Sequence, residues 1–176
     1  MTPQDASELY AYNDWANARL LACAEGLPPE DWTRDLGGAF PTLLGVVAHV
    51  VGSERVWLLR WRGETPKGRP AWMDAPTPAV LRAELTTVER ERAAFLASLS
   101  QEELDRPMSY TLMDGSGATL PLGTLVRHTA NHSTYHRGQI SSMLRRLGAA
   151  PPATDLLVFA VEAEEQRAAA RAGAEP

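Results

Sequence analysis

The chain has 176 residues, of which 44% are hydrophobic, a composition typical of globular proteins. This length favours one compact domain over residues 1–176, large enough to fold around a core, and the lone Cys23 excludes an intramolecular disulfide. The formal net charge of -5, from 17 basic and 22 acidic side chains, argues against a protein that binds nucleic acid through its phosphates.

The first eight residues have neither a basic n-region nor an apolar h-region, so we expect no signal peptide. The apolar stretches are far too short to span a membrane. Together these features predict a cytoplasmic protein that does not contact membranes. Cys23 is expected to be a small buried hydrophobic side chain in a helix.

Two helices are predicted in the first third of the chain. Residues 5–25 repeat apolar side chains at helical spacing up to Gly26. Residues 42–62 form the second helix, which Thr42 can cap and which ends in cations followed by Gly63. Both helices therefore have one face suited to a core.

A third helix is predicted to follow a loop at residues 64–76, which is rich in glycine, proline and charge. Thr77-Pro78 favours a helix start, with threonine at the cap and proline in the first turn. We interpret the charged run 89–92 as the solvated face of this helix.

Residues 105–119 predict an irregular or hairpin-like connection. A fourth helix follows, from about Leu120 or Leu122 to Leu147, and a last helical segment begins near Asp155, with a tail from about residue 166 that is expected to fray. Four long amphipathic helices without convincing strands predict an all-α four-helix bundle with a short extra C-terminal helical segment.

Three of the four histidines, His128, His132 and His136, follow one another at intervals of four residues. Neighbours in this series lie about 6 Å apart along a helix axis and can share one metal ion, whereas the outer pair is about 12 Å apart. This helix thus offers two ligands. The fourth histidine, His49, lies on the predicted inner face of another helix and can supply a third.

Spacing alone leaves a second interpretation open. Histidines in a core can also be polar residues that bond to backbone carbonyls and water. A metal would satisfy several buried imidazoles at once, which a set of ordinary hydrogen bonds does with difficulty.

The run from Asn131 to Ile140, Asn-His-Ser-Thr-Tyr-His-Arg-Gly-Gln-Ile, resembles the signature of the DinB/YfiT-like family of metalloenzymes. Residues 10–17, and His49 followed by Glu54 and Trp57, also resemble that family. The resemblance extends from the first helix to about Asp155. It implies a four-helix bundle in which His49, His132 and His136 hold one divalent metal ion.

Other residues near this motif receive separate predictions. His128 is expected to support the ligands rather than to bind the metal. Gln139 is interpreted either as a second supporting residue that points toward the same cavity or as a polar residue at the surface or an interface. Glu54 is about 140° from His49 around the helix, so we interpret it as a polar partner. Arg137 is expected in a surface ion pair, and Gly138 at the close approach of another helix.

The family resemblance also implies an activity. Relatives include thiol-dependent S-transferases and a maleylpyruvate isomerase, which favours a metal- and thiol-dependent S-transferase that acts on small electrophiles. The alternatives are a metal-dependent hydrolase and a non-catalytic, damage-inducible stress protein that binds metal. Zinc or nickel is the expected metal, iron is a further candidate, and a low-molecular-weight thiol is the candidate cofactor. The catalytic residues are unknown, and a homodimer is expected.

Overall fold

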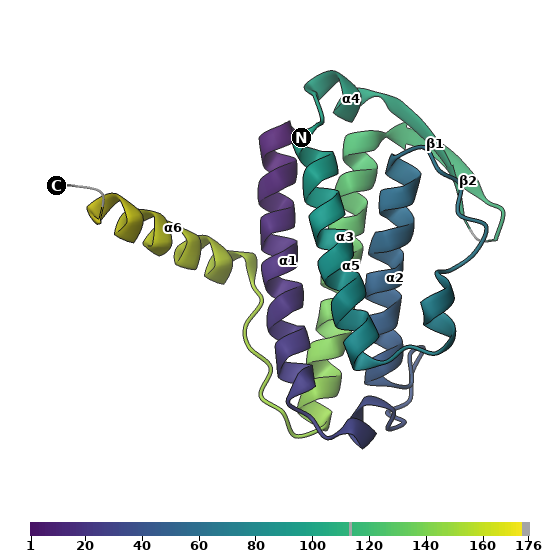
Figure 1. Cartoon of the computed structure of the whole chain (residues 1–176), viewed down its shortest axis with the longest axis vertical. Helices are drawn as coiled ribbons and strands as arrows, with labels where there is room; N and C mark the ends of the chain where they lie inside the picture. Colours follow the sequence, from purple (N-terminus) through teal and green to yellow (C-terminus); the bar gives the residue numbers. More distant parts are fainter. Residues whose placement is uncertain (113, 174–176) are drawn as a thin grey trace.

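The computed structural model describes residues 1–112 and 114–173, and four long helices form its body (Figure 1). These helices are α1 (Pro3–Glu25), α2 (Leu43–Trp61), α3 (Pro78–Ala97) and α5 (Leu122–Arg146). The remaining elements are α4 (Gln101–Asp105), α6 (Leu156–Ala172), the strands β1 (Pro107–Thr111) and β2 (Gly117–Pro121), and the short 3-10 helices η1 (Pro29–Trp32) and η2 (Ala71–Asp74). The predicted four-helix bundle is confirmed.

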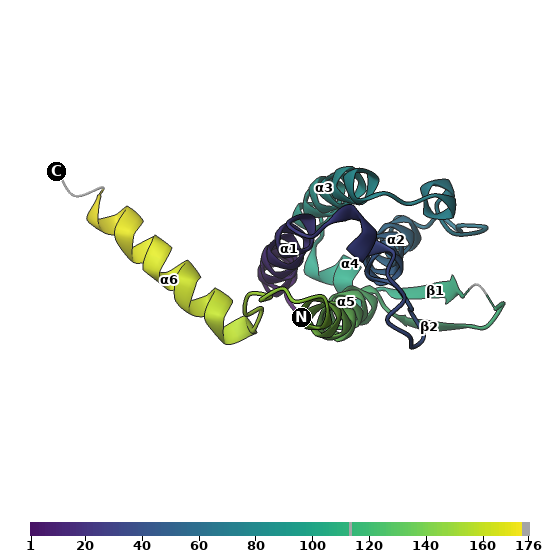
Figure 2. The ribbon, with the colours of Figure 1, turned by 90° about the horizontal axis from the view of Figure 1, so that it is seen from below.

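The order of the helices around the bundle differs from their order in the chain. Helices α1 and α2 lie diagonally opposite, and each packs against both α3 and α5 (Figure 2). Helices α2 and α3 run in the same direction, so residues 62–77 must return along the length of the bundle (Figure 1). This returning segment lies against α2, where the Met73 side chain packs over Gly52.

Helices α2 and α3 begin where the sequence predicts, whereas α1 begins at Pro3 rather than at residue 5. Thr42 Oγ1 accepts a hydrogen bond from the backbone N–H of Gly45, and Thr77 Oγ1 accepts one from Val80. Gly63, just after α2, has a φ of 85°, a left-handed conformation that suits glycine after a helix. Local sequence therefore fixes both ends of α2, the helix that carries His49.

The strands β1 and β2 form an antiparallel hairpin that begins within residues 105–119 and ends at Pro121, with Pro107 paired to Pro121 and Thr111 to Gly117. The hairpin-like prediction is thus confirmed, while the expectation of a chain without strands is wrong at this point. A Cβ at Gly117 would lie 2.2 Å from the Tyr110 carbonyl oxygen, so the hairpin requires glycine there.

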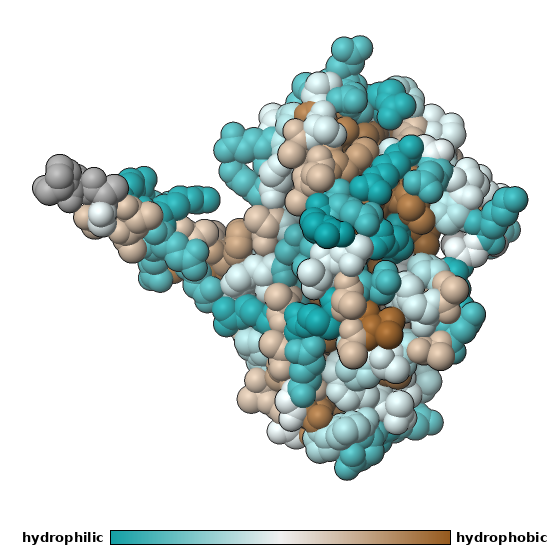
Figure 3. All heavy atoms as spheres, viewed as in Figure 1, coloured by the Kyte–Doolittle hydropathy of each residue, from teal (hydrophilic) through white to brown (hydrophobic). Residues whose placement is uncertain are grey.

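Helix α6 projects from the bundle and contacts it through α1 (Figures 1 and 3). Trp15 Nε1 donates to Glu162 at 3.0 Å. Helix α6 continues to Ala172, and the expected fraying from about residue 166 stays a prediction. Leu156 and Leu157 are exposed, but nothing in the structure tests the predicted homodimer, which stays a prediction. None of the described helices is long and apolar enough to cross a membrane.

The charged run 89–92 on α3 is not uniformly solvated, which corrects the sequence-based interpretation. Arg92 is only 1% exposed, and Glu89 is half-buried. Arg92 continues the core stripe of α3, which also contains Leu81, Leu85, Val88 and Leu96. The run thus places a cation at a core position, where it needs a buried partner.

Candidate metal centre

His49 on α2 meets His132 and His136 on α5 in the interior of the bundle. The Nε2 atom of His132 lies 3.2 Å from that of His49 and 3.1 Å from that of His136. One nitrogen from each ring lies within 4.8 Å of the others, so one ion can contact all three. The one-turn spacing of His132 and His136 produces this convergence, because it stacks them on one face of α5.

The three Nε2 atoms are arranged to bind one cation together rather than to form hydrogen bonds with one another. A neutral imidazole nitrogen carries either one hydrogen or one lone pair, so His132 Nε2 cannot make full hydrogen bonds to both neighbours. At least one of the two close contacts would then lack a normal hydrogen bond. A positive ion among the three nitrogens would remove this conflict, and three imidazoles are a donor set that zinc and other transition metals accept.

Gln139 fixes the tautomer of one ring. Its Oε1 atom lies 2.7 Å from His136 Nδ1 and accepts the hydrogen carried there. The lone pair of His136 therefore lies on Nε2, directed at the other two histidines. Gln139 thus contacts one of the candidate ligands, and its supporting role in metal binding stays a prediction. His132 Nδ1, by contrast, is buried without a partner among the described residues.

Burial keeps the other two rings neutral. It lowers the pKa of His49 and of His132 to about 4, and the neighbouring His136 adds a smaller effect in the same direction. Both rings are therefore uncharged at neutral pH, the form in which imidazole binds a metal.

His128 lies beside the cluster but outside it. Its ring centroid is 6.1 Å from that of His132, and it packs edge-on against Trp57 at 5.1 Å. His128 is also exposed. The structure thus brings three of the four histidines together and leaves His128 as a neighbour.

Phe40 covers the cluster, and sequence reasoning missed it. Its ring centroid lies 4.6 Å from that of His49 and 5.5 Å from that of His136. Phe40 lies in the irregular segment before α2, where no periodic pattern signals an inward side chain. Its ring shields the two imidazoles from water and so contributes to a local environment of low dielectric constant.

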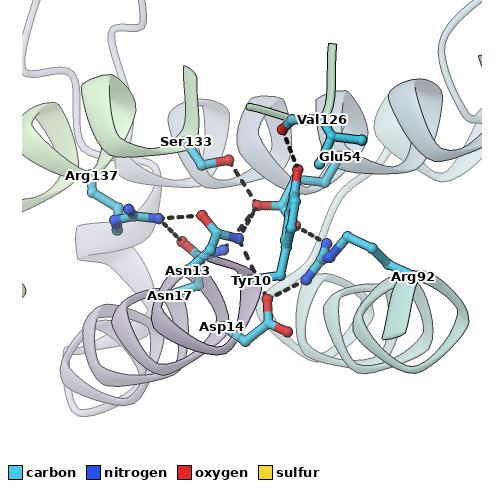
Figure 4. Close-up of polar contacts among 9 residues, drawn as sticks. All are labelled: Tyr10, Asn13, Asp14, Asn17, Glu54, Arg92, Val126, Ser133 and Arg137. Carbon is cyan, nitrogen blue, oxygen red and sulfur yellow. Dashed lines mark hydrogen bonds and ion pairs between the residues drawn. The ribbon is translucent and has the colours of Figure 1, made fainter. Parts of the chain in front are cut away.

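A buried polar cluster centred on Glu54 connects all four bundle helices (Figure 4). Glu54, 1% exposed, accepts at Oε1 from Asn13, Asn17 and Ser133 and at Oε2 from Arg92 Nη1 at 2.5 Å. Burial alone would raise the pKa of Glu54, but Arg92 and these hydrogen bonds hold it below its usual value. The predicted role of Glu54 as a polar partner is confirmed.

Arg137 belongs to the same cluster, so its predicted surface ion pair is wrong. It is 2% exposed, and Nη1 donates to Asn13 Oδ1 at 2.7 Å and to Asn17 Oδ1 at 3.0 Å. Ser133 follows His132 in the sequence, and Arg137 follows His136. The hydrogen bonds of Ser133 to α2 and of Arg137 to α1 therefore fix the rotation of α5 about its own axis. The explanation for Gly138 is also wrong, because a Cβ there would meet nothing within 4 Å.

A cavity of about 500 Å³ opens beside His49. The returning segment between α2 and α3 forms one wall, and one face of α2 forms another. Among the described residues that line the cavity, none carries a carboxylate; they include Phe40, His49, Val56, Trp57, Arg60 and Met73. The cavity has room for small organic molecules next to His49, the histidine of the cluster that lines it.

The bundle and the convergent imidazoles define this chain as a helical-bundle protein with a candidate three-histidine metal centre. The sequence model of the DinB family matches residues 1–168. The chain belongs to the DinB family.

Individual relatives agree with this assignment. The chain is 29% identical to Protein DinB of Bacillus subtilis (strain 168) over 167 residues, which cover 91% of this chain and 97% of that protein. It shares its fold with YfiT of Bacillus subtilis, described as a probable metal-dependent hydrolase with an unusual four-helix bundle topology. The TM-score is 0.61 at 18% identity, over 85% of this chain and 91% of YfiT. A DinB-like protein from Bacillus cereus ATCC 10987 gives a TM-score of 0.58 at 20% identity, over 82% of this chain and 91% of that one.

Proposed function

We propose that this protein is a divalent-metal-dependent enzyme that joins a small-molecule thiol to an electrophile. The observation that carries the proposal is the convergence of three Nε2 atoms beside a cavity. His49, His132 and His136 would hold the metal, and zinc or nickel suits this nitrogen donor set.

The chemistry follows from the charge of the ligands. A divalent ion held by three neutral imidazoles keeps its full charge and lowers the pKa of a water molecule or thiol that reaches it. The protein would contribute shielding by Phe40 and a fixed lone pair on His136, which Gln139 maintains. Cys23 lies in α1 and lines no part of the described cavity, so the thiol must come from a small molecule.

The lining of the cavity favours a thiol over water as the nucleophile. Metal-dependent hydrolysis in helical zinc sites uses a carboxylate as general base, and the described cavity lining offers none. Glu54 cannot take that role, because Arg92, two asparagines and Ser133 already occupy its oxygens. An ionised thiol needs no base when it attacks.

Hydrolysis is the second candidate, and the similarity to YfiT, described as a probable metal-dependent hydrolase, favours it. His128 is the titratable side chain that would serve as its base. A stress protein that binds metal without turnover is the remaining alternative.

An activity screen separates these possibilities. Zinc- and nickel-loaded protein is mixed with bacillithiol, mycothiol or glutathione and a fluorogenic electrophile, and in parallel with simple esters. We expect thiol conjugation that needs both the metal and a thiol and that His132→Ala abolishes. Ester cleavage without a thiol would favour the hydrolase. Metal binding with neither reaction would favour the non-catalytic alternative.

A further inference from the structure

The cavity beside His49 has a cationic end as well as a metal-binding end. Arg60 lies eleven residues after His49 on α2, close to three full turns, so both side chains leave the same face of the helix. Their Cα atoms are about 16 Å apart along the axis. Both residues line the one cavity, with Ser53 and Val56 between them.

Arg60 is buried, and none of the described residues is an anionic partner for it. It is 8% exposed, Nη2 donates to the Thr111 carbonyl at 2.9 Å, and the guanidinium lies over the Trp57 ring at 4.7 Å. No described carboxylate forms an ion pair with it, whereas Arg55 on the same helix pairs with Glu91 at 2.7 Å. A guanidinium carries five N–H donors, so most of those on Arg60 remain free for a ligand.

The rest of the cavity has no anion to compensate this charge. Of the charged residues among the described lining, Arg60 and Arg69 are both cations, although the whole chain has a net charge of -5. Arg69 is exposed and already pairs with Asp74 at 2.7 Å. Burial lowers the pKa of Arg60, because the cation has lost water without gaining a carboxylate. Arg60 is therefore the group in the cavity that most needs an anion.

Apart from Ser53, the side chains between the two ends are apolar. Val56, Trp57, Met73 and Leu112 line this space, together with Phe40 at the histidine end. The rise of α2 between His49 and Arg60 sets the length of the space between the two ends of the cavity. A ligand that fills this cavity would therefore need an anionic group at one end, an apolar middle and a metal-binding group at the other end.

We propose that the cavity binds a small organic carboxylate, with its acid group on Arg60, its apolar body between Trp57 and Met73, and its other end at the three histidines. This inference rests on the proposed function for the identity of the metal-binding end. The planar, forked guanidinium favours a carboxylate, which it can bind through two parallel hydrogen bonds.

A pair of probes that differ only in charge tests the inference. Cobalt-loaded protein is titrated with ω-mercaptohexanoate and with the neutral ω-mercaptohexanamide, and sulfur coordination is followed by its near-ultraviolet charge-transfer band. We expect the carboxylate to bind about tenfold more tightly than the amide, as a charge-assisted hydrogen bond would give. Arg60→Gln should abolish this preference, and Arg60→Lys should retain part of it. Arg69→Gln is the matched control and should retain most of it.

A second titration distinguishes failure of this inference from failure of the thiol proposal. Hexanoate and hexanamide, which have no thiol, are added to zinc-loaded wild type and Arg60→Gln, and binding is followed by NMR chemical shifts. Arg60-dependent binding of hexanoate, with no cobalt band from either thiol, would support the carboxylate site and refute the thiol. Equal binding of hexanoate to wild type and Arg60→Gln, with cobalt and zinc contents unchanged, would overturn the carboxylate site.

Discussion

The hydrogen on each imidazole decides whether the three histidines can receive a cation. Gln139 holds the hydrogen of His136 on Nδ1 and leaves the lone pair of Nε2 free. We therefore predict that Gln139→Ala weakens metal affinity by about 10–100-fold, the usual effect of losing a group that orients a ligand. Competition with a chromophoric chelator measures this loss. Unchanged affinity in the variant would show that the hydrogen bond does not orient the ring for binding.

His128 and His49 provide a matched pair of substitutions. His49 offers Nε2 to the cluster, whereas His128 is exposed and 6.1 Å from the His132 ring, centroid to centroid. We predict that His49→Ala loses far more metal affinity than His128→Ala, because it removes one of only three protein ligands. The same chelator titration compares the variants, and equal losses would count against the assignment.

The position of a residue could be predicted where its pattern lies within one helix, and could not be predicted where it depends on contacts between helices. The four-residue spacing of His132 and His136 is visible within one helix, so their shared face could be predicted. The burial of Arg92 and Arg137 could not, because it depends on Glu54, Asn13 and Asn17, which lie on other helices. Charged residues are usually exposed, and only a tertiary partner reverses that expectation.

At the scale of elements, the cluster around Glu54 joins α1, α2, α3 and α5. Removing the negative charge would leave Arg92 as a buried cation with Asp14 as its remaining anionic partner. We predict that Glu54→Gln lowers the free energy of unfolding by about 3–5 kcal/mol, the usual cost of breaking a buried ion pair. Urea denaturation of the metal-free protein measures the change.

The control for this substitution is an exposed ion pair. Arg82 and Glu25 lie 2.7 Å apart with side chains about one-third exposed, so Arg82→Gln should cost below about 1 kcal/mol. Similar losses for Glu54→Gln and Arg82→Gln would mean that the buried cluster does not hold the helices together.

The helices themselves were predictable because their caps and apolar periodicity are local. Thr42 and Thr77 begin α2 and α3 where the sequence indicates. The cavity was not predictable, since it forms where residues 62–77 fold back against α2, and no local pattern determines that path. The same holds for the pairing of Arg60 with the carbonyl of Thr111 in the hairpin.

At the scale of the whole molecule, buried acids make stability depend on pH. Burial, reinforced by Asp14, raises the pKa of Glu89 from 4.5 to about 7. Between these two values the folded protein binds more protons than the unfolded chain, so this group makes stability fall as pH rises. We predict that Glu89→Gln becomes more stable relative to wild type as pH rises from about 4.5 to 7, with a constant difference above that range.

Thermal or urea unfolding of both metal-free proteins across this pH range checks the prediction. The comparison between wild type and variant cancels the opposite contribution of His49 and His132, whose lowered pKa values make stability rise with pH. A difference that stays constant from pH 4.5 to 7 would show that Glu89 titrates as it does in the unfolded chain.

Elemental analysis of the purified protein determines whether His49, His132 and His136 bind one metal ion. Wild type and His132→Ala should be prepared without a metal-affinity column, loaded with zinc or nickel and freed of excess metal. We predict about one divalent ion per chain in the wild type and almost none in His132→Ala, with both proteins folded by circular dichroism. One tightly held ion per chain in folded His132→Ala would show that His132 is not a ligand of the metal and that the three-histidine site is wrong.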